Sequence, residues 1–526
     1  MKNLKITTAV FMLSGSLLIT SCRSSDNAVD NSGENLITNG SALIKMNLLG
    51  SEYESETIST QASAKHTNSY SVVKEQVSTF MAGEQPVIAT LTPVSAISTQ
   101  ASVNPIAAVV RNPLKGPNVK YRVIAYRTST GAKVATSVYT IDSNGNSTAD
   151  NGEMMLDGDN ETVNKYDFVV LSYNSSTAPA DVTGSISTAT LPSISGDNDL
   201  MYFRTNNVRV SKGDNVLNIL LTHKFSQITT VIDASAVAPG TPISSIGSGI
   251  VLDNHRRNGN SIALSTGVVS FGGTPATKSV SFTPPTPTSA IWTSNPTLIA
   301  NPGISATDMS TLIFPDSAAG AITVGTKSKR NFSVNNLVVT PGVKYNLKLK
   351  FACTADATPT WPFSMSDSGS GTRLTRTFNA PAADAGFVFD IYELDNSFNM
   401  TINGVDLATQ EIQFQSGVAN YPQNIRFKSD GSRWGENGVP QIYSLGSSTN
   451  TTPIIRITIG PDGSVSMMGR RTISSGLEPL ELYGGTRFNT VTWKTTGSNT
   501  VDATMLVTGA TVMRGLGVGK KIIACP

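Results

Sequence analysis

Charged residues are scarce in this chain: they make up 14% of its 526 residues, and the formal net charge is only +2. Such a balance does not provide the basic surface by which proteins hold nucleic acid, so we expect no nucleic acid partner. Histidine is scarcer still, since only His66, His223 and His255 occur. None has a metal-ligating neighbour at the spacing of a zinc site, and no nucleophile, base and orienting group can be assembled around them. The sequence indicates a protein that is not an enzyme and uses no cofactor.

Helical periodicity is almost absent as well. Instead, the chain contains 44 glycines, 26 prolines and many short runs in which apolar and polar residues alternate between turn signals, the pattern of half-buried strands. In one such run His223 shares a face with Leu217, Leu221 and Phe225. This predicts a hydrogen-bonded core histidine and not a ligand. We expect an all-β protein.

The one long apolar run lies at the start of the chain, where Lys2 and Lys5 precede residues 7–19 and Ser21 precedes Cys22. A basic end, a short apolar stretch and a small residue before a cysteine are typical of a bacterial lipoprotein signal, and the run is too short to span a bilayer. We predict that residues 1–21 are a signal peptide and that Cys22 is lipidated; a plain secretory peptide with a chance cysteine is the alternative. Two or three acyl chains would tether the protein stably to the outer membrane.

Two cysteines remain after Cys22, at positions 353 and 525. Because an exported protein lies in a compartment that permits disulfides, Cys353 and Cys525 could form a bridge that pins the end of the chain to an earlier domain. Cys353 also ends an apolar alternation over residues 345–353, where an unpaired thiol packs well. The sequence leaves both states open.

Composition divides the mature chain into segments. Residues 22–40 are small and polar, as in a flexible tether. We expect β-sandwiches over residues 41–225 and 226–355, and a Ser/Gly/Ala-rich linker over residues 356–386. Repeated alternation with hairpin signals predicts a third β domain, a sandwich or jelly roll, over residues 387–526.

One loop has the spacing of oxygen ligands in a calcium site. The ligand candidates are Asp142, Asn144, Asn146, Asp150 and Glu153. Position six of this register is Ser147, however, where a calcium-binding helix-loop-helix needs glycine, and strands are expected on both sides. A polar hairpin tip is therefore favoured over a metal site.

Two motifs in the last segment could be read as binding sites. Gly515–Lys520 resembles a phosphate-binding loop but lacks its spacing before the lysine and the Ser/Thr after it, so we interpret it as a glycine-rich strand and turn. Trp434, next to Arg433 in a Ser/Gly/Asn-rich loop, is the better candidate for ligand contact, because aromatic rings offer a large area with a polar edge. Packing of Trp434 on its own domain is nevertheless favoured over ligand contact.

Five segments occur in the order seen in a known family. They are Tyr121–Thr130 (YRVIAYRTST), Tyr166–Asn174 (YDFVVLSYN), Asp199–Phe203 (DLMYF), Leu221–Asp233 (LTHKFSQITTVID) and Pro341–Leu349 (PGVKYNLKL). In this order they resemble the fimbrillin-like lipoproteins of the Bacteroidetes. The resemblance covers residues 40–355 and leaves the C-terminal segment unassigned.

This resemblance implies two tandem transthyretin-like β-sandwiches, export to the cell surface and a place in a type V pilus as stalk, anchor or tip subunit. In such pili a protease, often specific for arginine, removes an N-terminal strand, and a strand of the next subunit fills the groove. This chain has no arginine between Arg23 and Arg111, which leaves Lys65 and Lys74 as candidate processing sites because Lys45 lies in the expected first strand. Alternatively, strand and lipid are both retained, as in an anchor.

We therefore expect a cell-surface lipoprotein of fimbrillin type that acts as an accessory, tip or anchor subunit of a pilus and in adhesion. Its partners would be the outer membrane, other fimbrillin-like subunits and, through the C-terminal domain, glycans or proteins on host or microbial surfaces. The alternative is a lipid-anchored module that binds glycans or proteins and never polymerises.

Overall fold

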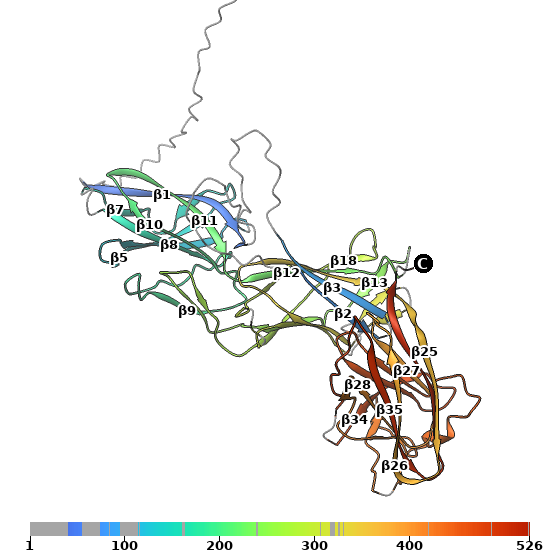
Figure 1. The fold of residues 1–526 in the computed structure, drawn as a ribbon. Coiled ribbons are helices and arrows are strands. Elements are labelled where there is room, and N and C mark those ends of the chain that lie inside the picture. The colour runs from blue at the N-terminus through green and yellow to red at the C-terminus, as the bar shows by residue number, and fades with distance from the viewer. Residues whose placement is uncertain are drawn as a thin grey trace, which may run out of the picture.

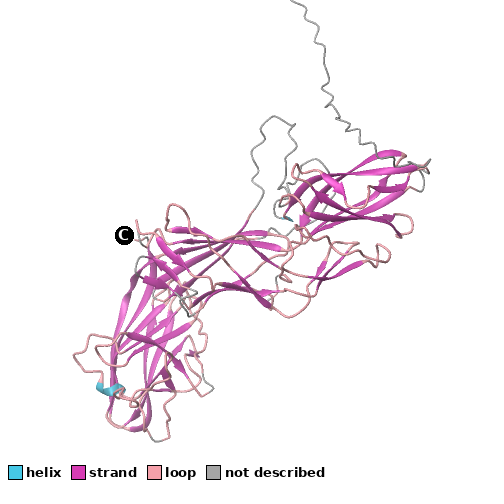
Figure 2. Ribbon diagram, turned by 180° about the vertical axis from the view of Figure 1, so that it is seen from behind, coloured by secondary structure: helices cyan, strands magenta, loops and turns pink. Residues whose placement is uncertain are grey.

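The structure is a computed structural model that describes residues 40–54, 74–94 and 114–525, apart from residues 84, 115, 160–163, 238–239, 304, 306, 316–320, 325–326, 330, 419, 485–486 and 524. Strands dominate this part of the chain (Figure 2), with a short 3-10 turn, η3 (Ile442–Ser444), in the C-terminal part. Within these ranges no helix is long and apolar enough to cross a membrane. The expected all-β class is confirmed.

Eight strands form the first body, at one end of an elongated molecule (Figure 1). In order of pairing they are β6 (Ser147–Ala149), β5 (Lys133–Ile141), β4 (Lys120–Arg127), β8 (Lys165–Ser172), β10 (Met201–Arg209), β11 (Gly213–His223), β1 (Ser41–Glu52) and β7 (Met154–Asp157). Their inward faces share a core that includes Tyr121, Phe168 and Ile219. Alternation along strands such as β11 thus becomes one buried face, whereas β4 and β8 are buried on both faces.

The middle body consists of two larger sheets and one small one. The first larger sheet has the strand order β18 (Ile291–Thr293), β12 (Ser226–Asp233), β24 (Lys344–Phe351), β3 (Gln85–Pro93), β2 (Gln76–Ala82), and β19 (Thr297–Ile299) also pairs with β12. The second has the order β17 (Ala276–Ser279), β14 (Val251–His255), β20 (Ser310–Phe314), β23 (Phe332–Leu337). The small sheet has the order β13 (Ile243–Ile246), β21 (Ile322–Val324), β22 (Lys327–Lys329). The two larger sheets share a core that includes Ile232, Leu312 and Leu347.

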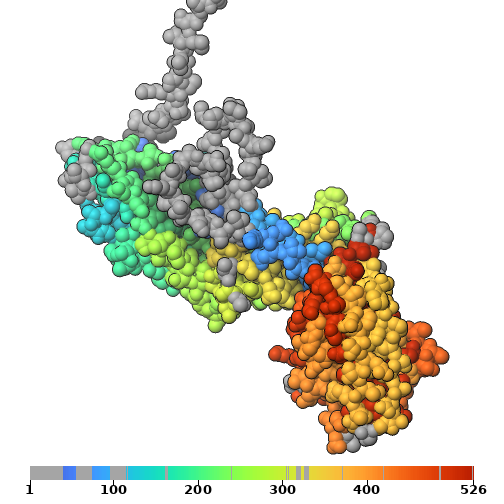
Figure 3. Space-filling view, viewed as in Figure 1, coloured from blue at the N-terminus to red at the C-terminus, as the bar shows by residue number. Residues whose placement is uncertain are grey.

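The middle body takes strands from both sides of the expected boundary at residue 225. β3 pairs with β24, from Val87 opposite Phe351 to Pro93 opposite Tyr345. Residues 76–93 therefore lie in the second sandwich and not, as expected, in the first; Figure 3 shows them in blue beside the C-terminal body. Alternation along a strand shows which face is buried, but it does not identify the strand that pairs with it.

The first and middle bodies also share a core. β9 (Thr190–Ile194) pairs with β15 (Asn260–Ala263), which pairs in turn with β16 (Val269–Ser270). Leu191 and Ile262 from this small sheet pack in one cluster with Ile124 and Leu171 of the first body. Continuous apolar packing thus joins the two bodies.

Residues 353–525 form the C-terminal body, in which two sheets enclose a core. One sheet has the strand order β25 (Cys353–Asp367), β36 (Thr511–Ile523), β27 (Phe387–Leu394), β32 (Ile455–Ile459), β33 (Val465–Arg470), β34 (Leu477–Leu482), β31 (Ile425–Phe427). The other has the order β26 (Ser370–Ala380), β35 (Asn499–Thr508), β28 (Ser397–Ile402), β29 (Val405–Asp406), and β30 (Ile412–Gln413) also pairs with β28. The linker expected over residues 356–386 is wrong, because β25 and β26 occupy most of it. Their Ser and Thr residues lie mainly on exposed faces, while Ala357, Phe363 and Met365 are buried.

The run Gly515–Lys520 lies in β36, where Gly515 and Gly517 face aromatic rings. A Cβ atom on Gly515 would be 2.6 Å from the ring of Phe363, and one on Gly517 would be 2.7 Å from the ring of Phe387. The missing side chains make room for these rings in the core. The run is a strand, as expected, and not a phosphate-binding loop.

Candidate functional site

The strongest candidate site is β1 together with the surfaces that hold it. β1 pairs in parallel with β11, from Ala42 opposite Gly213 to Glu52 opposite Thr222. On its other side it pairs with β7 over only four residues, from Ser41 to Ile44. β1 thus belongs to a sheet whose other strands all come from residues 120–223. In this respect β1 resembles a strand that has been added to a sheet formed by another segment.

The first half of β1 is anchored by apolar side chains. Ala42 and Ile44 are fully buried in the core of the first body, and Met46 and Leu48 pack against that core. On the outward face, the Nζ atom of Lys45 lies 2.7 Å from a carboxylate oxygen of Asp214, with both side chains more than half exposed. A surface ion pair of this kind contributes little to stability, so the buried side chains hold this half.

The second half of β1 ends against polar groups. The register with β11 shifts between Leu48 and Gly50, and Ser51 follows as a buried residue. The Nε2 atom of His223 lies 3.2 Å from the hydroxyl oxygen of Ser51, and its Nδ1 atom lies 2.7 Å from a carboxylate oxygen of Asp199. The expectation that His223 is a hydrogen-bonded core residue is confirmed.

The candidate processing sites lie on the segment that leads from β1 to β2. Lys74 is exposed and precedes β2 by two residues. Because β1 and β2 belong to different sheets, a cut at Lys74 would cross no strand pairing. Lys65 and the lipidation site Cys22 lie outside the described residues, so both remain predictions.

Trp434 lies in the core and not in a ligand-binding surface. Its side chain has no exposed area, its ring centroid is 4.6 Å from that of Phe427, and its indole N–H donates to the Arg470 carbonyl at 3.0 Å. The possible ligand contact by Trp434 is therefore wrong, and the favoured reading, that Trp434 packs on its own domain, is confirmed. A polar loop composition indicates exposure on average, whereas this loop turns one large ring inward.

Arg433, the other residue of the expected ligand contact, is occupied by neighbours in its own domain. Its guanidinium donates to the hydroxyl of Tyr483 at 2.7 Å and to the carboxylate of Glu436 at 2.8 Å. The hydrogen bond to Tyr483 is the main reason that the pKa of Arg433 is raised. These contacts fix the loop that carries Trp434.

The calcium candidates do not converge on a common point. The Asp142 carboxylate accepts hydrogen bonds from the backbone N–H groups of Asn144 and Asn146, the latter of which chiefly lowers its pKa. Asp150 instead pairs with Lys120 at 2.7 Å, which lowers its pKa, and burial raises the pKa of Glu153. Among the described residues, no three His, Cys, Asp or Glu side chains are grouped as a metal site requires. The loop is a polar hairpin between β5 and β6.

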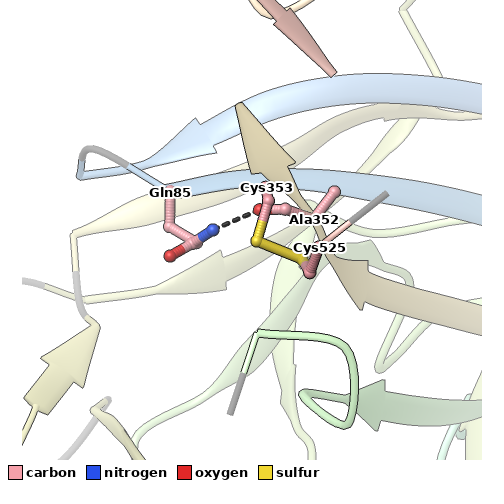
Figure 4. The surroundings of a disulfide bond; sticks show 4 residues. All are labelled: Gln85, Ala352, Cys353 and Cys525. Atoms are coloured by element: carbon pink, nitrogen blue, oxygen red, sulfur yellow. Dashed lines mark hydrogen bonds between the residues drawn. A yellow bond between two sulfur atoms is a disulfide. The ribbon is translucent and has the colours of Figure 1, made fainter. Parts of the chain in front are cut away.

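Cys353 and Cys525 form a disulfide at the junction of the middle and C-terminal bodies (Figure 4). Only Ala352 separates β24 from β25. The backbone N–H of Ala352 donates to the Pro86 carbonyl at 3.0 Å, and its carbonyl accepts a hydrogen bond from the Gln85 side chain. The bridge thus joins both ends of the C-terminal body where that body meets β3.

Sequence reasoning did not identify the polar end of β1 as a site. Ser51 and Tyr53 are common residue types, and their partner His223 is far away in the chain. The local signal was the break in alternation at Leu48, Leu49 and Gly50, which indicates a bulge. Only the long-range pairing with β11 shows what the bulge positions.

No protein-family model matches this chain, and no curated protein sequence matches it. Among solved structures, a candidate cell adhesion protein from Bacteroides fragilis is 12% identical, with a TM-score of 0.31 over 59% of this chain and 96% of that one. A candidate cell adhesion protein from Bacteroides uniformis is 15% identical, with a TM-score of 0.29 over 44% and 89%. The tip fimbrial protein Mfa3 from Porphyromonas gingivalis is 11% identical, with a TM-score of 0.26 over 44% and 92%. Similarity at this level assigns neither a family nor a function to this chain.

Proposed function

We propose that this chain is a cell-surface lipoprotein of fimbrillin type that serves as an accessory, tip or anchor subunit of a pilus and in adhesion. It would act by binding, through addition of a partner's strand at the place of β1. The observation that supports this is the pairing of β1: it lies beside β11 in parallel, with only four residues paired to β7. Such a strand can be replaced without rearranging the strands that follow it.

The physical basis is the surface that β1 covers. Loss of β1 would leave the backbone N–H and carbonyl groups along one side of β11 unpaired and would uncover the core next to Leu217, Ile219 and Leu221. An unpaired strand edge above apolar residues favours the pairing of another strand. Backbone hydrogen bonds would then supply affinity, and side chains at alternate positions would supply register.

In the proposed function, the predicted lipid anchor at Cys22 and the strand β1 would be kept or lost together. A cut at Lys65 or Lys74 would place Cys22 and β1 on one fragment, so loss of the strand would also release the lipid anchor. A chain that is not cut would keep both and act as an anchor. Cleavage therefore decides between the two roles.

Strand addition can be tested with a labelled peptide of residues 41–54. The full chain is cut with a lysine-specific protease, the protease is inhibited, and an excess of peptide is added. We expect the peptide to enter the cut protein and to remain bound during gel filtration, because it competes with a strand that is no longer covalently attached. Fluorescence that co-elutes with the protein measures the uptake.

The matched control is the Lys65→Ala/Lys74→Ala variant treated in the same way. Its β1 stays tethered at high effective concentration, so uptake should remain at background. A cut chain that takes up no more peptide than this variant, despite verified cleavage, would refute strand addition.

A second candidate function is a lipid-anchored module that binds glycans or proteins without polymerising. It is favoured by two tyrosines of the C-terminal body, Tyr421 and Tyr443, which are 38% and 48% exposed. Exposed aromatic rings are typical of binding surfaces.

For this second candidate, the Tyr421→Ala/Tyr443→Ala variant should lose at least about tenfold in affinity for host or bacterial cells, with unchanged thermal unfolding. Flow cytometry of labelled protein measures the binding. Unchanged binding in the variant would exclude this surface as the site.

A further inference from the structure

The two halves of β1 make chemically different contacts. Before the bulge at Gly50, the buried side chains are apolar and lie in the core of the first body. After it, Ser51 and Tyr53 are 3% and 4% exposed and lie next to His223, which is 5% exposed. Any strand that replaces β1 would meet both environments.

The hydrogen bonds of His223 define which group can sit beside it. The Asp199 carboxylate accepts from the Nδ1 side at 2.7 Å, and its other oxygen accepts from the Asn174 side-chain amide at 2.9 Å. The role of each ring nitrogen depends on the tautomer, and a hydroxyl group can both donate and accept a hydrogen bond. The hydroxyl of Ser51, 3.2 Å from Nε2, therefore supplies the hydrogen-bond partner that this buried nitrogen needs.

Two further residues, Tyr53 and Glu54, contact an aromatic ring and a cation. The ring of Tyr53 is stacked on that of His223, with centroids 4.0 Å apart and planes 2° from parallel. A carboxylate oxygen of Glu54 lies 3.3 Å from the Nζ atom of Lys224. The two residues that make these contacts lie two and three positions after Ser51 in the chain.

A turn of the middle body closes this end. The backbone N–H of Glu54 donates to the carbonyl of Gly342 at 2.9 Å. Gly342 has a φ of 76°, and a Cβ atom there would lie 3.1 Å from the Glu54 side chain. The end of β1 and the residues that follow it, Tyr53 and Glu54, are thus held between the His223–Lys224 segment and this turn.

We propose that this end is a recognition site for the incoming strand, and that it selects a hydroxyl side chain followed, two and three residues later, by an aromatic ring and a carboxylate. The inference rests on the proposed strand addition and names the partner's chemistry. The surface that contacts the first half of β1 is apolar and would accept many strands with alternating apolar residues. The polar surface around His223 would accept an incoming strand in one register. A strand displaced by two residues would leave His223 without its hydrogen-bond partner at Nε2 and without its stacking partner.

The test is a competition in the cut full chain. Labelled wild-type peptide 41–54 is displaced by unlabelled peptides that carry Ser51→Ala, Tyr53→Ala or Glu54→Gln. We expect Ser51→Ala to compete about tenfold less well, since it leaves a buried ring nitrogen of His223 without a hydrogen-bond partner. Tyr53→Ala should lose about tenfold or more, and Glu54→Gln about twofold to fivefold because its ion pair is partly exposed.

A Lys45→Ala peptide is the matched control, because Lys45 pairs on the exposed face and should lose less than about twofold. The substitutions are made only in the peptides, so a difference in competition cannot come from misfolding of the protein. If the wild-type peptide enters but the Ser51→Ala and Tyr53→Ala peptides compete equally well, the recognition site is refuted while strand addition stands. If no peptide enters, strand addition fails and the recognition site with it.

Discussion

Replacing both Cys353 and Cys525 by alanine is expected to lower the free energy of unfolding of the C-terminal body by about 5 kcal/mol. The disulfide joins residues 172 positions apart, and closing so long a loop removes much of the conformational entropy of the unfolded chain. The bridge also ties the start of β25 to the end of β36, which pair from Cys353 opposite Ile523 onward. Without it, this end of the pair should fray first.

Denaturant unfolding under oxidising conditions, followed by tryptophan fluorescence, measures this effect. Three of the four tryptophans, Trp361, Trp434 and Trp493, lie in the C-terminal body, so the signal reports mainly on it. Wild-type protein treated with a reductant should unfold at the midpoint of the alanine variant. Equal midpoints for oxidised and reduced wild-type protein would contradict the prediction.

Replacing Trp434 by alanine is expected to destabilise the C-terminal body by about 3–5 kcal/mol, the usual cost of removing a large aromatic ring from a core. The ring is fully buried between Phe414 and Phe427, and it donates a hydrogen bond to the Arg470 carbonyl. The structure also leaves no side chain at Gly469, where a Cβ atom would lie 2.7 Å from the indole. The cavity left by alanine would be lined by rigid strands that cannot close it.

Tyr443→Ala is the matched control for Trp434→Ala, because Tyr443 is an aromatic residue of the same region that is 48% exposed. Its replacement should change the unfolding free energy by less than about 0.5 kcal/mol. Differential scanning calorimetry of the two variants distinguishes a structural from a surface role. A Trp434→Ala variant that unfolds at the wild-type temperature would show that the ring does not support the core.

Local patterns predicted much of this fold. Alternation placed His223 on the buried face of a strand, and the structure adds its partners, Asp199 and Ser51. The missing spacing in Gly515–Lys520 correctly excluded a phosphate-binding loop, whereas the Ser/Gly/Ala composition of residues 356–386 incorrectly indicated a linker. Composition describes the average surroundings of a segment, and it fails where exposed Ser and Thr alternate with a few buried residues.

The candidate site was less accessible to sequence reasoning. Lys74 could be identified in advance as a basic residue of the segment proposed for processing, but its position between two sheets could not. The polar end of β1 depends on a contact between Ser51 and His223, which are 172 residues apart. No short window of sequence contains both partners.

The all-β character and the buried face of strands such as β11 and β24 could be predicted from the amino-acid sequence, because both follow from the spacing of neighbouring side chains. Four features are visible only in the folded structure: residues 76–93 join the middle body, Trp434 is buried, Cys353 and Cys525 form a disulfide, and the end of β1 contacts His223. Each of these depends on which strands come together. The physical reason is that strand pairing gains its free energy from contacts between distant segments, which a local pattern permits but does not select.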